Sequence, residues 1–242
     1  LNLDGLMPQA PSSDTAGWFA RSAETLSRVG RVLYQEDIPD RLNHRLLIAR
    51  DAFAYSGSET QTALAPGLNR LSKLFREVTE VDMALNGLDQ WSEAQRTVQA
   101  AEFWQTFSDW IDRHNPRMSY SVARNLFIAS KIESSVLESA QLVKQQATER
   151  MKSLLPRGTL LCLPTTPFCA PRVNLPIHET DALRLQISVL CCHGGLTGVP
   201  HVSIPGATTG PDHAPIGLSI IAGHNYDTDL LAASLALEAQ HD

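Results

Sequence analysis

The chain has 242 residues, of which 43% are hydrophobic and 19% are charged, a balance that supports a globular protein with a sizeable core. Its formal net charge is −6, so phosphate backbones and anionic membrane surfaces are unfavourable partners. No apolar run approaches the roughly 18 residues of a membrane-spanning helix, and no basic-then-apolar leader marks export. We therefore expect a cytoplasmic protein that binds neither nucleic acid nor membrane.

Apolar spacing in the first two thirds of the chain predicts helices joined by short strands. Ser22 is a suitable N-cap for a helix through Leu33, whose apolar residues recur at helical spacing. Residues 45–50 (RLLIAR) are short and apolar, as a strand is, and Pro66 fits the first turn of a helix through Phe75. The other elements predicted in this part of the chain are a strand at 78–83 and helices at 92–114, 122–132 and 134–155.

The helix predicted at 92–114 carries aromatic and branched side chains on one face. We expect this face to pack in the core, and a partner helix is the alternative. Its five apolar side chains are Phe103, Trp104, Phe107, Trp110 and Ile111.

The last third of the chain is richer in uniformly apolar runs. Residues 159–163 (TLLCL) predict a buried strand, and two more buried strands are predicted at 202–204 and 216–221. Helices are predicted at 183–192 and 227–237. Apolar strands that alternate with helices indicate an α/β protein whose sheet is covered on both faces. No linker or repeat divides the chain, so we expect residues 1–242 to form a single α/β unit.

The cysteines and the histidine near residue 190 raise the question of a metal site or a nucleophile. Cys191, Cys192 and His193 are consecutive, whereas zinc ligands usually stand two to four residues apart and number four. A Cys–His nucleophile pair needs an orienting partner, which the sequence does not identify. We therefore expect buried, reduced cysteines, a histidine at a helix end, and no metal.

Three stretches, in register from end to end, resemble one family. Residues 8–22 (PQAPSSDTAGWFARS) match the pattern PLAPSFDTVG-ARS, and residues 160–171 (LLCLPTTPFCAP) match a strand followed by a PT-P turn. Residues 194–207 (GGLTGVPHVSIPGA) and 214–238 (APIGLSIIAGHNYDTDLLAASLALE) resemble the closing pattern NLTGLPAVSVP … LPVGLQLIG … D-LL. These patterns belong to the amidase signature family of serine amide hydrolases. GWFAR and residues 128–167 look similar to the plant-type indoleacetamide hydrolase subgroup.

The resemblance implies hydrolysis of a small carboxamide to an acid and ammonia, on a mixed central β-sheet covered by helices on both faces, without a cofactor. The family's centre is a lysine, a serine in a cis peptide and a nucleophilic serine in a glycine- and serine-rich signature. No run such as GGSSGG occurs in the 242 residues, and none of the lysines stands in such a context. The four lysines of the chain are Lys73, Lys131, Lys144 and Lys152.

In the family, this signature precedes a loop like residues 8–22. We therefore expect the chain to be the C-terminal, substrate-pocket half of an amidase-signature domain, with no catalytic residue of its own. Two alternatives are left open: a non-catalytic amidase-like protein that binds a partner, and one chain of a split amidase with a companion polypeptide. Whether homodimers form is open as well.

The same resemblance assigns the substrate-binding candidates near the front. Asp14, Thr15 and Gly17 match the loop that follows the signature, close to the nucleophile. The alternative is a turn in which Asp14 accepts hydrogen bonds from backbone N–H groups. Trp18 and Phe19 contact either substrate or core, and core anchoring is the commoner role of aromatic residues after a loop.

Further candidates lie later in the chain. By resemblance, Phe127 borders the acyl pocket, and Cys192 and Leu196 line a mostly apolar part of it. A pocket lined by such uncharged side chains favours aryl or alkyl acyl groups over amino-acid substrates.

Three positions depart from the family's pattern, and one of them is a candidate site residue. Ser13 stands where the pattern has phenylalanine, and Gly195 stands where the closing pattern has asparagine. Glutamine-dependent members carry an acidic residue about seven positions before that asparagine, and Ser188 stands there in this chain. Because a serine supplies no charge for an α-ammonium group, a glutamine-dependent tRNA amidotransferase is disfavoured.

Overall fold

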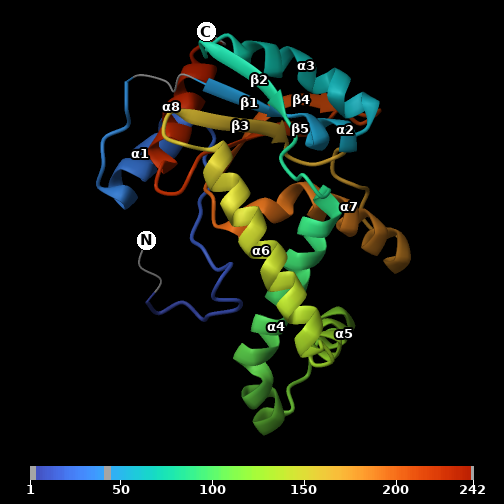
Figure 1. Ribbon diagram of the computed structural model, residues 1–242. Coiled ribbons are helices and arrows are strands. Elements are labelled where there is room, and N and C mark those ends of the chain that lie inside the picture. The colour runs from blue at the N-terminus through green and yellow to red at the C-terminus, as the bar shows by residue number, and fades with distance from the viewer. Residues whose placement is uncertain (1–3, 41–44, 241–242) are drawn as a thin grey trace.

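In the computed structural model, the described residues, 4–40 and 45–240, form a five-stranded sheet with helices on both sides (Figure 1). The strands are β1 (Arg45–Ala49), β2 (Glu77–Val81), β3 (Thr159–Pro164), β4 (His201–Thr209) and β5 (Ala214–Ile221). They lie in the order β2-β1-β3-β5-β4. β1 is parallel to β2 and β3, whereas β5 is antiparallel to β3 and β4. The prediction of an α/β fold with a mixed central sheet is therefore confirmed.

Alternation along the central strands divides the core into two clusters, because successive strand side chains point to opposite faces. Leu161 and Leu163 of β3 belong to the cluster with α4 (Leu88–His114), α6 (Ser134–Leu154) and α7 (Ile177–Thr197). Leu160 and Cys162 belong to the opposite cluster, with α3 (Ser58–Ser72) and α8 (Asp227–Glu238). Helices therefore cover both faces of one sheet. That residues 1–242 form a single unit stays a prediction.

The strand predicted at 78–83 and the strand predicted as buried at 202–204 are the two edges of the sheet. Val78 of β2 is 41% exposed, and the side chains of β4 alternate between exposed and half-buried as far as Pro205. An edge strand has a neighbour on one side only, and β4 carries a proline that a central strand excludes. The apolar residues of these runs did not reveal the edge position.

The first three helices differ in how well the sequence located them. α1 (Ala23–Tyr34) begins as predicted, with the Ser22 hydroxyl accepting a hydrogen bond from the Thr25 amide at 3.1 Å. α2 (Arg50–Tyr55) was not predicted. α3 begins at Ser58, so Pro66 lies inside the helix and its assignment to the first turn was wrong. The buried stripe of α3 begins one turn earlier than its leucines indicate.

α4 begins before its predicted start and ends at His114 as predicted, whereas α7 is longer than predicted at both ends. The core side of α4 is its first half, with Leu88, Trp91, Ala94 and Val98 buried. Its aromatic stripe, expected in the core, is only half-buried or exposed, because this end of α4 projects with α5 (Tyr120–Ala129) away from the sheet (Figure 1).

α7 ends at Thr197 and is followed by Gly198, whose φ of 75° gives the left-handed C-cap that glycine tolerates best. His193 therefore lies inside this helix, and its expected place at a helix end was wrong. Within the described residues, no helix has both the length and the apolarity needed to cross a membrane.

Candidate functional site

Residues 8–20, here called the front loop, close on themselves through Asp14. The Asp14 carboxylate accepts hydrogen bonds from the backbone N–H groups of Gln9 at 2.8 Å and Ala10 at 3.1 Å. The Ala10 carbonyl in turn accepts from the amides of Ser13 and Asp14, at 2.8 and 2.9 Å. The expectation that Asp14 accepts backbone hydrogen bonds is confirmed, with donors that precede it in the chain. The loop thus has an internal structure of its own.

Polar contacts also fix the front loop to α4 and α6. The Ser12 amide donates to Glu102 Oε2 at 2.9 Å, and Lys144 Nζ donates to Ser12 Oγ at 2.6 Å. Partial burial lowers the pKa of Lys144, and nearby Glu102 opposes that shift. A lysine beside a serine is the pair that activates some nucleophiles, but here the Ser12 amide is already bonded to a carboxylate and offers no donor to an oxyanion. We interpret this contact as an anchor of the loop.

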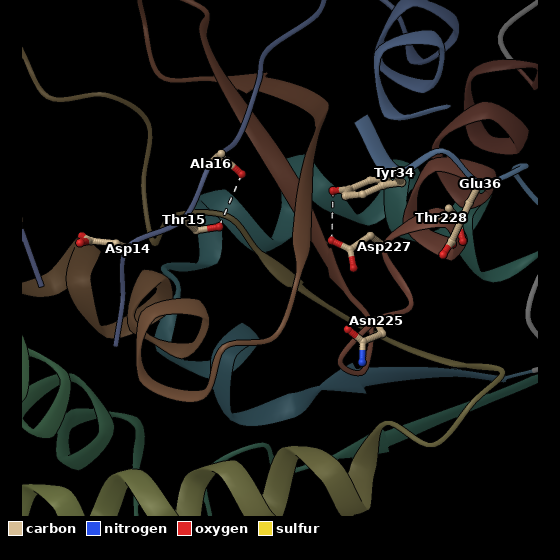
Figure 2. Close-up of a pocket in the computed structure, with 8 residues that line it drawn as sticks. All are labelled: Asp14, Thr15, Ala16, Tyr34, Glu36, Asn225, Asp227 and Thr228. Atoms are coloured by element: carbon tan, nitrogen blue, oxygen red, sulfur yellow. Dashed lines mark hydrogen bonds between the residues drawn. The ribbon is translucent and has the colours of Figure 1, made fainter. Parts of the chain in front are cut away.

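A polar cavity of about 320 Å³ lies between the front loop, the end of α1 and the start of α8 (Figure 2). The Tyr34 hydroxyl donates to Asp227 Oδ1 across it at 3.1 Å, and burial together with the Asp227 charge raises the pKa of Tyr34. In Figure 2 the Asp14 side chain points away from this pair. The residues that line the cavity are Asp14, Thr15, Ala16, Tyr34, Glu36, Asn225, Asp227 and Thr228. Its carboxylates make it a poor site for an anion.

The two residues after Ala16 have separate environments. Gly17 is exposed, and a Cβ there would meet nothing within 4 Å. Trp18 packs between α1 and α8: its indole N–H donates to the Leu26 carbonyl at 3.1 Å, and its ring lies 5.7 Å from that of Tyr34. The interpretation of Trp18 as a core anchor is supported. Phe19 is fully exposed at 104%, so a core role for Phe19 was wrong.

A second cavity, of about 480 Å³, lies at the carboxyl ends of the parallel strands β1 and β3. In sheets with helices on both faces, ligands commonly bind beyond this edge. The aromatic rings of Tyr55 and Phe168 line it together with Gln186 of α7. The Thr60 hydroxyl donates to the Pro167 carbonyl at 2.9 Å and ties α3 to the loop after β3. This cavity offers rings, an uncharged amide and the carboxylate of Glu59, which already accepts hydrogen bonds from the Thr209 hydroxyl and the Gly210 amide. The sequence did not indicate Tyr55, Phe168 or Gln186.

Hydroxyl groups gather beside that loop. Thr165 Oγ1 lies 2.8 Å from Ser203 Oγ and 3.0 Å from Ser219 Oγ, and the Cys191 thiol donates to the Thr165 carbonyl at 3.4 Å. The absence of a side chain at Gly217 leaves room for this group, because a Cβ there would stand 3.0–3.1 Å from two of the hydroxyls. The PT-P turn marked Thr165 in the sequence, but only sheet pairing brings the two serines to it.

The remaining predicted residues do not converge on one cavity. Ser188 is half-buried, with its hydroxyl 2.7 Å from Ser92 Oγ of α4 and donating to the Leu185 carbonyl at 2.7 Å. Cys192 and Leu196 lie on the face of α7 that is buried in the core. Phe127 is 65% exposed on α5.

The cysteines and histidines of α7 occupy contrasting environments. Cys191 is exposed in surface area, so its expected burial was wrong, although the surrounding protein partly covers its thiol and raises its pKa. Cys192 is buried, and burial raises its thiol pKa as well. His193 is 2% exposed, and neither of its ring nitrogens has a hydrogen-bond partner. Burial and the neighbouring His201, whose ring centroid is 5.3 Å away, lower the pKa of His193 to about 3. Among residues 4–40 and 45–240, no three His, Cys, Asp or Glu side chains are placed to hold a metal ion.

Comparison with known proteins gives consistent results. A family model described as Amidase matches residues 71–231, about two thirds of the chain. "Amidase 1" of Arabidopsis thaliana is 24% identical over 265 residues, covering 97% of this chain and 62% of that relative. "Translocon at the outer membrane of chloroplasts 64" of Pisum sativum is 22% identical, covering 94% of this chain and 42% of the relative. A solved amidase structure superposes with a TM-score of 0.79 at 22% identity, covering 96% of this chain and 54% of the other. The chain thus spans between 42% and 62% of the length of these proteins.

Proposed function

This chain belongs to the amidase family, and on that premise we propose that it forms part of an enzyme that hydrolyses a carboxamide to a carboxylate and ammonia. The single observation that carries the proposal is the family match over residues 71–231, which is in accord with a fold similar to a solved amidase over 96% of the chain. In the family's chemistry a serine oxygen attacks the amide carbon, ammonia leaves with a proton, and water cleaves the acyl-enzyme ester.

We infer that these 242 residues supply the substrate pocket and that the Lys-Ser-Ser centre lies outside them. The chain contains no signature run to carry that centre. What it does contain is a fixed front loop with a cavity beyond the end of β5, and a second cavity at the opposite edge of the sheet, beyond the end of β3. Orienting the carbonyl against a nucleophile and excluding water account for much of the rate in such reactions. Asp14, Thr15 and Gly17 are proposed as the wall nearest the nucleophile.

The proposed substrate carries an uncharged aryl or alkyl acyl group. The cavity lined by Tyr55 and Phe168 suits a flat or apolar group, and Gln186 is able to hydrogen-bond to it without charge. The Glu59 carboxylate in the same lining is already bonded to Thr209 and Gly210, and it disfavours an acidic acyl group. Ser188 supplies no carboxylate for an α-ammonium group, which disfavours glutamine. Indoleacetamide-like amides fit this description and agree with the resemblance of residues 128–167.

The test combines mass with activity on protein purified from its natural source. Intact mass under denaturing conditions is measured first, because a second polypeptide or a mass well above 26.5 kDa identifies the proposed catalytic segment. Ammonia release is then measured with phenylacetamide and with glutamine. We expect turnover of phenylacetamide alone, and we expect Phe168→Ala to raise its KM more than Phe127→Ala does.

A second function is favoured by one observation, the missing signature, and is supported by the similarity to a protein whose name assigns it to a translocon. In this alternative the chain binds a protein partner and catalyses nothing. A mass near 26.5 kDa with no second species and no amide turnover supports it and rejects the enzyme.

A further inference from the structure

Gln95 links three elements beneath the front loop. It lies on α4 and is only 7% exposed. Its amide Nε2 donates to Ser13 Oγ at 3.1 Å, and the Ser13 hydroxyl donates to the backbone carbonyl of Gly195 at 3.3 Å. One continuous chain of hydrogen bonds therefore runs from α4 through the front loop to the last turn of α7.

The three residues are matched in size. A Cβ at Gly195 would clash with Gln95 Nε2 and stand 3.0 Å from Gln95 Cδ, so the amide occupies the space that a side chain at 195 needs. Gly195 and Ser13 are both small, and both border the same buried amide. Gly195 and Ser13 thus leave the room that Gln95 fills.

This arrangement carries a cost that packing alone does not explain. The other amide atom, Gln95 Oε1, is buried without a hydrogen-bond partner. A buried acceptor without a donor destabilises a fold, and an apolar residue of similar shape avoids that cost. Local rules of stability are most often broken where a residue serves function.

We infer that Gln95 is a positioning residue that holds the front loop, through Ser13, against α7 and so fixes the cavity wall formed by Asp14 and its neighbours. Glu102, seven residues further along the same face of α4, holds the Ser12 amide at 2.9 Å. Exposed contacts such as that of Ser12 are weak because water competes for them. The buried Gln95 contact is the one that sets the loop's position. The link to substrate rests on the proposed amide hydrolysis, whereas the link to the loop does not.

The first test is a double-mutant cycle on the full protein, read as the melting temperature. Inside a helix, Gly→Ala normally raises the melting temperature by about 2–4 °C, because alanine has a higher helix propensity than glycine. We expect Gly195→Ala to lower it instead, because the methyl group meets Gln95. In the Gln95→Ala background the same substitution has room, and the sign reverses. Gly57→Ala, where a Cβ meets nothing within 4 Å, is the control and behaves alike in both backgrounds.

The second test reads the loop directly by amide hydrogen exchange. The Ser13 and Asp14 amides are bonded to the Ala10 carbonyl, so their exchange reports whether the loop keeps its shape. We expect Gln95→Ala and Ser13→Ala to accelerate exchange at both amides at least tenfold, and Ser13→Thr, which keeps the hydroxyl, to leave it unchanged. Unchanged exchange in Gln95→Ala, or a Gly195→Ala effect of the same sign in both backgrounds, overturns the inference.

A kinetic arm addresses the substrate. A correctly placed front loop contributes equally to binding of the ground state and of the transition state. We therefore expect Gln95→Ala, which releases this loop, to raise KM for phenylacetamide about tenfold while kcat stays within twofold. A loss in kcat alone assigns Gln95 a different role and contradicts the inference. If the unaltered protein releases no ammonia from any amide, the proposed function fails, while the exchange result still decides the role of Gln95.

Discussion

Acid should destabilise this protein through His193 well before its carboxylates are protonated. The imidazole is buried with both nitrogens unpartnered, and its pKa is lowered from 6.5 to about 3. In the unfolded chain the same ring is protonated near pH 6.5, whereas in the folded chain it stays neutral down to about pH 3. Stability contributed by neutral His193 is therefore complete above pH 6.5 and is lost progressively as the pH falls from 6.5 towards 3.

The size of this effect follows from the linkage relation. Between pH 6.5 and pH 5 the unfolded chain binds one proton more than the folded chain. The free energy of unfolding therefore falls by about 1.4 kcal/mol per pH unit, or about 2 kcal/mol in total. Domains are stable by about 5–15 kcal/mol, so this loss is easily measured. His201, whose pKa is also lowered by burial, adds to the effect in the same pH range. Carboxylates whose pKa is lowered in the folded protein, such as Glu59 and Asp181, reduce stability only when the pH falls below their pKa in the unfolded chain, near 4.

The assay is urea unfolding followed by tryptophan fluorescence at intervals between pH 8 and pH 5. Replacement of His193 by leucine removes the titrating group and both unpartnered nitrogens, so we expect a much flatter pH profile and stability at pH 8 equal to or above that of the wild type. His178→Gln is the matched control, because His178 is 83% exposed, and it should follow the wild-type profile. If His193→Leu loses as much stability as the wild type between pH 7 and pH 5, the reasoning is refuted.

Three further predictions concern local contacts. Ser22→Ala removes the N-cap of α1 and should lower the free energy of unfolding by about 1 kcal/mol, measured by urea titration; an unchanged value contradicts the cap. Gly30→Ala places a methyl group against buried Leu231 and should cost about 1–3 kcal/mol, whereas a gain in melting temperature would show that α1 and α8 are less closely packed than described. A thiol reagent should modify exposed Cys191 in the native protein but reach buried Cys162, whose pKa is raised by burial, only on unfolding; peptide mass mapping distinguishes the two.

The sequence alone determined the parts of this protein that depend on local pattern. The run TLLCL predicted β3, which is buried along its whole length, and Ser22 predicted the start of α1 because a hydroxyl there satisfies a free helix amide. Motifs spread over the chain indicated the amidase family, and the family match confirmed it. Apolar periodicity and capping are short-range properties, so a single sequence displays them.

Tertiary structure decided what depends on neighbours distant in the chain. Val78 and Ile204 look like core residues in sequence, yet both lie on edge strands, since strand order is set by pairing between remote segments. His193 and Cys191 are two residues apart on α7, but the first is buried and the second exposed, because α7 presents different faces to the core and to solvent. The contact of Gln95 with Ser13 and Gly195 joins positions 82 and 182 residues apart. No local pattern in the sequence marks such a contact, because it exists only once the helices have packed on the sheet.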